Sequence, residues 1–224
     1  MDGEKVLMAD LREDIRIVYR SEKEAVVYKP AGMATQLSND IKGSSLESKL
    51  KSILGKNEIF FPHRLDRVTC GLLLVCFDKD TVALYNEQIR KGGFSKYYVA
   101  KVESSISEPA GLTGTHKRYL KTINGKSRIV KSGGAPSFLE IIKFEPAPGS
   151  HEQYYALIHL ITGRTHQIRV MLADLGIPLS GDKLYNPASK FKDFYLESAA
   201  LEFSDTEGIN RYFETDNKII RRIK

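Results

Sequence analysis

The densest group of polar residues in the sequence is Pro62-His-Arg-Leu-Asp-Arg67, which stands just before the apolar run Leu72 to Phe77. A continuous apolar run of this length indicates a strand covered on both faces. A carboxylate such as Asp66, flanked by Arg64 and Arg67 at the mouth of a core strand, stays ionised and is aimed by rigid backbone, as a nucleophile or general base requires. A surface loop of ion pairs explains the same residues and is a commoner structure.

A second polar group, Thr162-Gly-Arg-Thr-His-Gln-Ile-Arg169, lies between a predicted strand and a predicted helix. The start of a helix presents unpaired backbone N–H groups, and Arg164, His166 and Arg169 add positive charge beside them. This combination suits a phosphate or a carboxylate. The alternative is a capped helix start with a solvated basic face.

Metal and hydrolase chemistry find little support in the sequence. It contains neither G-x-S-x-G nor G-x-x-x-x-G-K-S/T, the motifs of a nucleophile elbow and a P-loop. The histidines form no pair one helical turn apart and no cluster with cysteine, so we expect no metal site and no cofactor. They are His63, His116, His151, His159 and His166.

The composition is that of an ordinary globular protein. The 224 residues are 42% hydrophobic and 28% charged, which is enough for a sizeable core. No apolar run can cross a bilayer and the first residues do not resemble a targeting signal, so we expect no membrane association. With only Cys70 and Cys76, we expect a reducing cytoplasm. The formal net charge of +6 favours a polyanionic partner only modestly.

Periodicity and turn residues predict one α+β domain without repeats or linkers. A capping box at Ser44 and Glu47 starts the first predicted helix, and Gly55 ends it. Residues 103–135 are predicted to form loops around short strands, and the tail 218–224 to be frayed. The other predicted elements are strands near 15–19, 25–28, 72–77, 95–102, 138–144, 154–161 and 196–203, and helices at 80–91 and 165–175.

Three segments, in this order, resemble the RluA-type pseudouridine synthases. His63 to Val75 is similar to that family's H-R-L-D-x-x-T-S-G-L-L-L-V signature, Lys96 to Ala100 to its K-x-Y-x-A strand, and Thr162 to Val170 to its G-R-T-H-Q-I-R segment. Val27 to Gly32 and Gly181 to Tyr185 are further similarities. The resemblance covers most of the chain, from about residue 15 to residue 203.

The resemblance implies the pseudouridine synthase fold, an α+β catalytic domain whose mixed, largely antiparallel sheet is flanked by helices. We expect this domain to span residues 1–224, with short tails at 1–13 and about 205–224 and no separate N-terminal RNA-binding domain. The implied partner is RNA, either tRNA or rRNA, bound by a monomer.

The resemblance also assigns the site. Asp66 is the implied catalytic aspartate, Tyr98 lies against the flipped uracil, and Arg164 pairs with Asp66. Arg64 helps to displace the target base. The remaining implied RNA-binding residues are His63, Arg67, His166 and Arg169. The basic runs 116–118 and 126–128 are expected to add phosphate contacts.

The chain departs from the family pattern at three positions. Cys70 stands where the signature usually has Ser, Met171 where His often follows, and Glu197 where a late L-H-A segment has His. None of these removes an implied catalytic group, but the last two bear on substrate choice.

Two other functions compete with RNA isomerisation. A non-catalytic RNA-binding protein could use the same scaffold, although Asp66, Tyr98 and Arg164 are all present. A glycosidase or nucleosidase needs a second carboxylate and an admitted water. No acidic residue lies near Asp66 in the sequence, so Asp78 or Asp182 would have to approach it in the fold.

Overall fold

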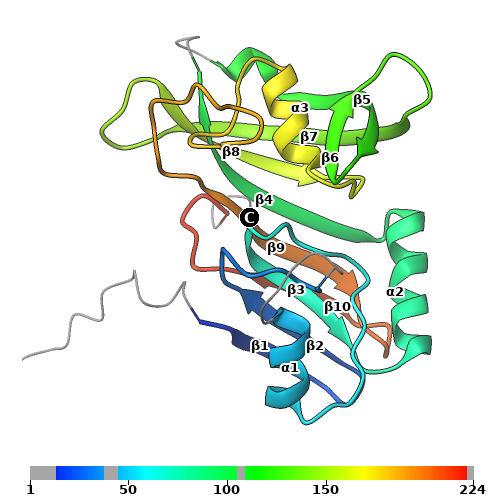
Figure 1. The fold of residues 1–224 in the computed structure, drawn as a ribbon. Coiled ribbons are helices and arrows are strands. Elements are labelled where there is room, and N and C mark those ends of the chain that lie inside the picture. The colour runs from blue at the N-terminus through cyan, green and yellow to red at the C-terminus, as the bar shows by residue number, and fades with distance from the viewer. Residues whose placement is uncertain (1–13, 38–44, 105–108, 221–224) are drawn as a thin grey trace, which may run out of the picture. The chain divides into compact units, whose positions relative to one another are not determined.

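The computed structural model describes residues 14–37, 45–104 and 109–220, and the chain forms two compact units, Met1–Gln88 and Ile89–Lys224. Each unit combines antiparallel strands with helices (Figure 1), which confirms the predicted α+β class. The extent of the catalytic domain stays a prediction, and its expected tail at 1–13 lies outside the described residues.

The first unit is built on three antiparallel strands, β1 (Arg16–Arg20), β2 (Glu24–Lys29) and β3 (Cys70–Cys76). β1 and β2 correspond to the strands predicted near 15–19 and 25–28, and they form a hairpin. Every residue of β2 and β3 is buried, as the apolar run of β3 predicted. The polar loop that carries Asp66 therefore enters a strand fixed by core packing.

Two helices accompany these strands. α1 (Leu46–Leu54) starts at Ser45, whose side chain accepts a hydrogen bond from the Ser48 backbone N–H, and it ends at Gly55 in the left-handed conformation. The capping box is thus one residue later than predicted, with Ser48 in place of Glu47 as its second member. α2 (Lys79–Lys91) buries Thr81 and Tyr85 and leads into the second unit.

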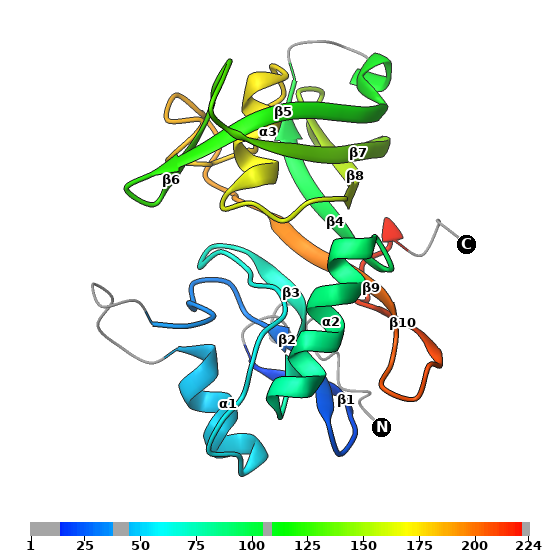
Figure 2. The same ribbon diagram turned by 90° about the vertical axis from the view of Figure 1, so that its right-hand side faces the viewer.

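The second unit is a longer antiparallel sheet. Its strands run in the order β10 (Asn210–Glu214), β9 (Leu196–Ser204), β4 (Phe94–Glu103), β8 (Gln153–Leu160), β7 (Ala135–Pro146), β5 (Gly114–Ile123) and β6 (Lys126–Ile129). α3 (Gln167–Asp174) lies close to β6 (Figures 1 and 2), and a 3-10 turn occupies Pro109–Leu112. β4 has a strand on either side and so sits inside the sheet.

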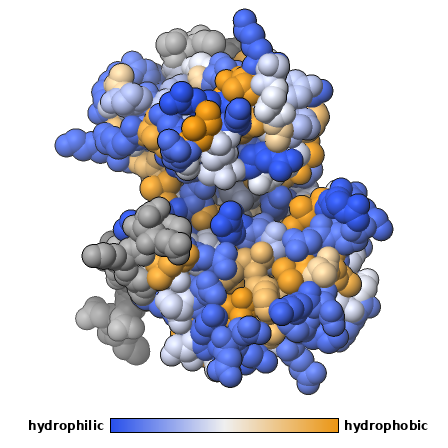
Figure 3. Space-filling model, turned by 45° about the vertical axis from the view of Figure 1, so that its right-hand side comes forward, coloured by the Kyte–Doolittle hydropathy of each residue, from blue (hydrophilic) through white to orange (hydrophobic). Residues whose placement is uncertain are grey.

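Hydrophilic side chains dominate the face shown in Figure 3, and hydrophobic ones are scattered among them in small groups. In the part of the chain that the structure describes, no helix is long and apolar enough to cross a membrane.

The prediction of loops around short strands at 103–135 is wrong for β5, which is a long strand of 10 residues. β5 and β6 form a hairpin closed by Asn124 and Gly125, which have φ angles of 49° and 73°. Two positive φ values in a two-residue loop are typical of a type I′ turn, which suits the twist of a hairpin. The Asn-Gly pair was therefore the sequence signal for these strands.

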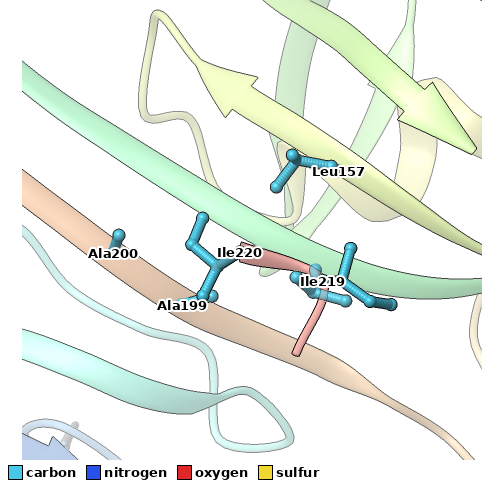
Figure 4. Close-up of a cluster of buried hydrophobic side chains, with 6 residues drawn as sticks. Leu157, Ala199, Ala200, Ile219 and Ile220 are labelled. Atoms are coloured by element: carbon cyan, nitrogen blue, oxygen red, sulfur yellow. The ribbon is translucent and has the colours of Figure 1, made fainter. Parts of the chain in front are cut away.

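The prediction of a tail from about residue 205 is also wrong as far as residue 220. β10 pairs with β9, and Ile219 and Ile220 are buried. Figure 4 shows both isoleucines beside Leu157, Ala199 and Ala200, within the core of the second unit. The apolar isoleucines explain this placement, because burial removes their side chains from water. Residues 221–224 lie outside the described part.

Candidate active site

The loop that carries Asp66 is fixed on both sides of the carboxylate. The Leu65 backbone N–H donates to Thr35 Oγ1 (3.3 Å), and the Thr35 hydroxyl donates to the Leu65 carbonyl (2.8 Å). On the other side, the Gly32 N–H donates to the Arg67 carbonyl (2.7 Å), and Arg67 Nε donates to the Gly32 carbonyl (2.8 Å). These reciprocal bonds hold the backbone around Asp66 in place.

A tight turn completes the loop. The Asp66 carbonyl accepts a hydrogen bond from the Thr69 N–H (3.1 Å), directly before β3. The Asp66 side chain is partly exposed, whereas Leu65 and Thr69 are buried. The sequence prediction of a carboxylate on rigid backbone at the entrance of a core strand is therefore confirmed in its geometry.

Lys29, at the end of β2, ties this loop to the strand. Its side chain is fully buried, and its Nζ donates to the carbonyls of Pro30 (2.9 Å) and Met33 (2.8 Å) and, at 3.5 Å, to that of Arg67. Burial lowers the pKa of Lys29 to about 8, and electrostatic interactions with the Cys70 and Asp66 side chains oppose that shift. Lys29 is thus a positive charge beneath the Asp66 loop.

His63 and Arg67 are partly occupied by backbone contacts. The Leu74 N–H donates to His63 Nε2 (3.2 Å), so the hydrogen bond assigns the ring proton to Nδ1 and a neutral imidazole. The Arg67 Nε is bound to Gly32, as described above, while the Arg64 side chain is exposed. The predicted RNA contacts of these residues stay predictions, and Arg64 and Arg67 are more exposed than His63.

The second unit holds Tyr98 and Arg164. Tyr98 lies on β4 opposite Ile158 of β8, and it shares a buried face with Lys96 and Ala100. Arg164 has an exposed side chain in the turn before α3. The predicted pairing of Asp66 with Arg164 joins the two units and stays a prediction.

Gln167 organises the turn that presents Arg164. Its Oε1 accepts hydrogen bonds from the Arg164 N–H (3.0 Å) and the Thr162 hydroxyl (2.8 Å), and its Nε2 donates to the Phe138 carbonyl (2.9 Å). The sequence analysis did not single out this residue. A buried amide at a polar junction between strand and helix was the available signal, because such an amide can satisfy several backbone groups at once.

His166 adopts a left-handed backbone conformation, with φ at 53°. That conformation is rare for a residue with a side chain and costs about 1–2 kcal/mol. The His166 Nδ1 lies 3.1 Å from the Tyr185 hydroxyl, which donates to the Ser127 carbonyl (3.0 Å). These contacts link the turn before α3 to β6.

Arg169 does not have the accessible side chain that its predicted RNA contact requires. Its Nε and Nη2 donate to the two oxygens of Asp182 (2.8 and 2.7 Å), and both side chains are buried. The guanidinium also lies over the ring of Tyr185. The structure therefore corrects this assignment, because Arg169 anchors the segment around Asp182 inside the second unit.

Two of the residues that depart from the family pattern, Met171 and Glu197, are buried. Met171 is fully buried in α3, and Glu197 is buried on β9, where its Oε2 accepts from Asn217 Nδ2 (2.7 Å) and the Tyr195 hydroxyl.

Asp182 cannot serve as the second carboxylate of a glycosidase while it is paired with Arg169. Among the residues described, no group of three or more His, Cys, Asp or Glu is placed to hold a metal ion.

Comparison with known proteins decides the family. A family model described as RNA pseudouridylate synthase matches residues 24–174. The chain belongs to this family. The pseudouridylate synthase model spans the Asp66 loop, β4 and the turn before α3, which confirms the predicted family resemblance.

Several relatives support the assignment. The tRNA pseudouridine synthase C of Haemophilus ducreyi is 31% identical over 180 residues, covering 77% of this chain and 74% of the relative. The uncharacterized RNA pseudouridine synthase MG209 of Mycoplasma genitalium is 29% identical over 182 residues, covering 81% of this chain and 58% of the relative. The chain also covers 65% of the uncharacterized RNA pseudouridine synthase YhcT of Bacillus subtilis. It thus spans somewhat less than two thirds of these last two proteins.

The fold is shared with a solved pseudouridylate synthase structure. Human RNA Pseudouridylate Synthase Domain Containing 1 superposes with a TM-score of 0.71 and 22% identity, covering 100% of this chain and 89% of that one. The predicted pseudouridine synthase fold is therefore confirmed.

Proposed function

We propose that this chain is an RNA pseudouridine synthase that isomerises specific uridines in tRNA or rRNA, with Asp66 as the catalytic carboxylate. The observation that carries the proposal is the doubly fixed Asp66 loop at the start of β3, within the segment that matches the family. The tRNA-modifying relative favours tRNA as the substrate class. We further propose that a monomer works in the cytoplasm, where Cys70 and Cys76 form no disulfide.

The reaction requires one well-placed carboxylate. The bond from ribose C1′ to uracil N1 breaks, the uracil turns, C1′ bonds to C5, and the proton on C5 is lost while N1 gains one. No electron is transferred overall. Asp66 can act either by attacking C1′ or by taking the 2′ proton, because an ionised carboxylate serves as nucleophile or base.

The other residues have supporting roles in this proposal. The target base must leave its stack, and a loop nucleotide costs least to extrude. Arg64 fills the vacated place, and Tyr98 provides the ring surface for the uracil. Arg164 keeps Asp66 charged and oriented through the two-pronged geometry that a carboxylate accepts.

Substitution of Asp66 tests the function. We expect Asp66→Asn to fold and to bind RNA, but to release tritium from RNA labelled at uracil C5 at least about 10²–10⁴-fold more slowly than the parent, because an essential base or nucleophile is lost. The readout is tritium release in single-turnover reactions on unmodified tRNA and rRNA transcripts. Asp80→Asn, an identical change at an exposed position of α2, serves as the matched control and should behave as the parent. Release by Asp66→Asn within about tenfold of the parent, a difference of only about 1.4 kcal/mol in the barrier, would overturn the assignment.

A further inference from the structure

Lys96 is a buried lysine on the interior strand β4. It is 2% exposed and shares the buried face of β4 with Tyr98. Its Nζ faces the turn before α3, because a Cβ atom added to Gly163 would lie 3.5 Å from it. The ammonium group therefore lies against the residue that directly precedes Arg164.

Among the residues that the structure describes, two lysines, Lys29 and Lys96, are buried, and their ammonium groups have very different surroundings. Lys29 donates hydrogen bonds to backbone carbonyls, as described above, and is a structural cation. For Lys96, the described residues provide neither a hydrogen-bond acceptor nor a carboxylate within ion-pair distance. Burial lowers the pKa of Lys96 to about 8, with no neighbouring charge among the causes, so the group is still mainly protonated at neutral pH. A buried cation without a partner destabilises the folded protein.

Three features of the Gly163 turn favour an anion beside Lys96. Gly163 places no side chain against Nζ, and Arg164 adds a second positive charge at the next position. The turn also leads into the N-terminus of α3, where the helix dipole attracts negative charge. A lysine ammonium is a compact point charge that binds phosphate oxygens well.

We propose that Lys96 and the Gly163 turn form a phosphate-binding subsite that receives a backbone phosphate of the RNA. This inference rests on the proposed function only in taking RNA as the partner. The bound phosphate compensates the buried charge, so the cost carried by the RNA-free protein is recovered on binding. Lys96 thus binds the substrate although it is buried and is not part of the exposed basic surface.

The subsite is tested by Lys96→Met, which keeps most of the length of the side chain and removes the charge. Binding is measured in an Asp66→Asn background, so that the outcome is independent of catalysis. The probes are a single-stranded oligouridylate of about nine nucleotides and an unmodified tRNA transcript, titrated between about 50 and 200 mM salt. Lys29→Met provides the structural contrast. Lys49→Met, which removes an exposed charge from α1, is the matched control.

The expected results separate binding from structure. Lys96→Met should melt at or above the temperature of the parent, bind RNA about tenfold more weakly, and lower the slope of log affinity against log salt by about 0.7, the value for one single-strand phosphate contact. Lys29→Met should melt at a lower temperature, and Lys49→Met should match the parent. Unchanged affinity and slope for Lys96→Met, or a loss of folding like that of Lys29→Met, would overturn the subsite. Neither outcome bears on the tritium-release test of Asp66.

Discussion

Arg169 and Asp182 form a buried, bidentate ion pair that supports the segment after α3. Asp182 also accepts hydrogen bonds from the backbone N–H groups of Leu184 (2.9 Å) and Tyr185 (3.3 Å). Burial raises the pKa of Asp182, but the Arg169 guanidinium and these two N–H groups outweigh it, so the pKa lies below its ordinary value. The carboxylate is therefore ionised and held by four donors at once.

Removing this carboxylate should destabilise the protein severely. We expect Asp182→Asn to lower the free energy of unfolding by about 3–5 kcal/mol, because it removes the carboxylate that compensates the buried charge of Arg169. Urea denaturation of the parent and the variant measures the difference. Asp174→Asn is the control, since Asp174 pairs with Arg118 at the surface and its loss should cost at most about 1 kcal/mol. Equal losses in the two variants would contradict the assigned role of Arg169.

The pH dependence of this pair follows from the sign of the shift. A carboxyl group with a lowered pKa in the folded state stabilises the protein above its unfolded pKa of about 3.9, and this stabilisation is lost as the pH falls through the folded value. The parent should therefore lose stability below about pH 4 more steeply than Asp182→Asn.

Residue types predicted candidate site residues only where neighbouring residues in the sequence indicate the chemistry. Asp66 was identifiable because a carboxylate between two arginines precedes an apolar run, and its rigid loop was then found in the structure. The roles of Lys96 and Gln167 could not be predicted in this way. Lys96 is buried against Gly163, and Gln167 is buried against Phe138, and each partner is distant in the sequence. The same reason explains the error at Arg169, since a basic side chain in a basic segment gives no local sign that Asp182 will bury it.

The hairpin of β5 and β6 carries a positively charged face. Lys121 lies directly opposite Arg128 across the two strands, and both side chains are exposed. Like charges in directly opposed positions destabilise a hairpin. This hairpin contains the predicted RNA-binding run 126–128, so the electrostatic cost is consistent with a surface that meets phosphates.

Replacing Lys121 by Glu should separate the effect of this charge on hairpin stability from its effect on RNA binding. We expect Lys121→Glu to raise the stability of the hairpin by up to about 1 kcal/mol, because the new carboxylate faces Arg128 across the strands. RNA affinity should fall and its salt slope should decrease, since a phosphate-binding charge has been reversed. Filter binding at several salt concentrations and thermal melting give the two readouts, with Lys49→Glu on α1 as the control for net charge. RNA binding equal to that of the control would show that this hairpin is only a solubilising surface.

Elements with strong local signals were predicted well. The leucines of α1 recur at helical spacing and Gly55 marks its end, and β3 reads as an unbroken apolar run. For the hairpin of β5 and β6 the sequence predicted only short strands without bounds, because these exposed strands are rich in lysine, arginine and threonine and their polarity concealed the strand pattern. Only the Asn124-Gly125 turn marked these strands locally.

The C-terminal segment completes the core of the second unit. The Thr215 N–H donates to the Ala199 carbonyl (2.8 Å), and Asn217 donates to Glu197 of β9 and to the hydroxyl of Tyr195, which directly precedes β9. These contacts place Ile219 and Ile220 against Val99 of β4 and Leu157 of β8. The burial was not predictable from the sequence, because the two isoleucines stand among lysines and arginines and their partners are far away in the chain.

Truncating one of these isoleucines measures how much the C-terminal segment contributes to stability. Ile220 is fully buried, so Ile220→Ala removes three carbon atoms from a closed core and leaves a cavity. Substitutions of this kind cost about 2–5 kcal/mol in the free energy of unfolding. The control is Ile209→Ala, because Ile209 is 47% exposed and its truncation should change stability by no more than about 0.5 kcal/mol. Guanidinium denaturation compares the two, and catalysis well below the melting temperature should be unaffected in both. If Ile220→Ala unfolds at the same denaturant concentration as Ile209→Ala, the C-terminal segment does not stabilise the core, and its packing in the structure has no energetic consequence.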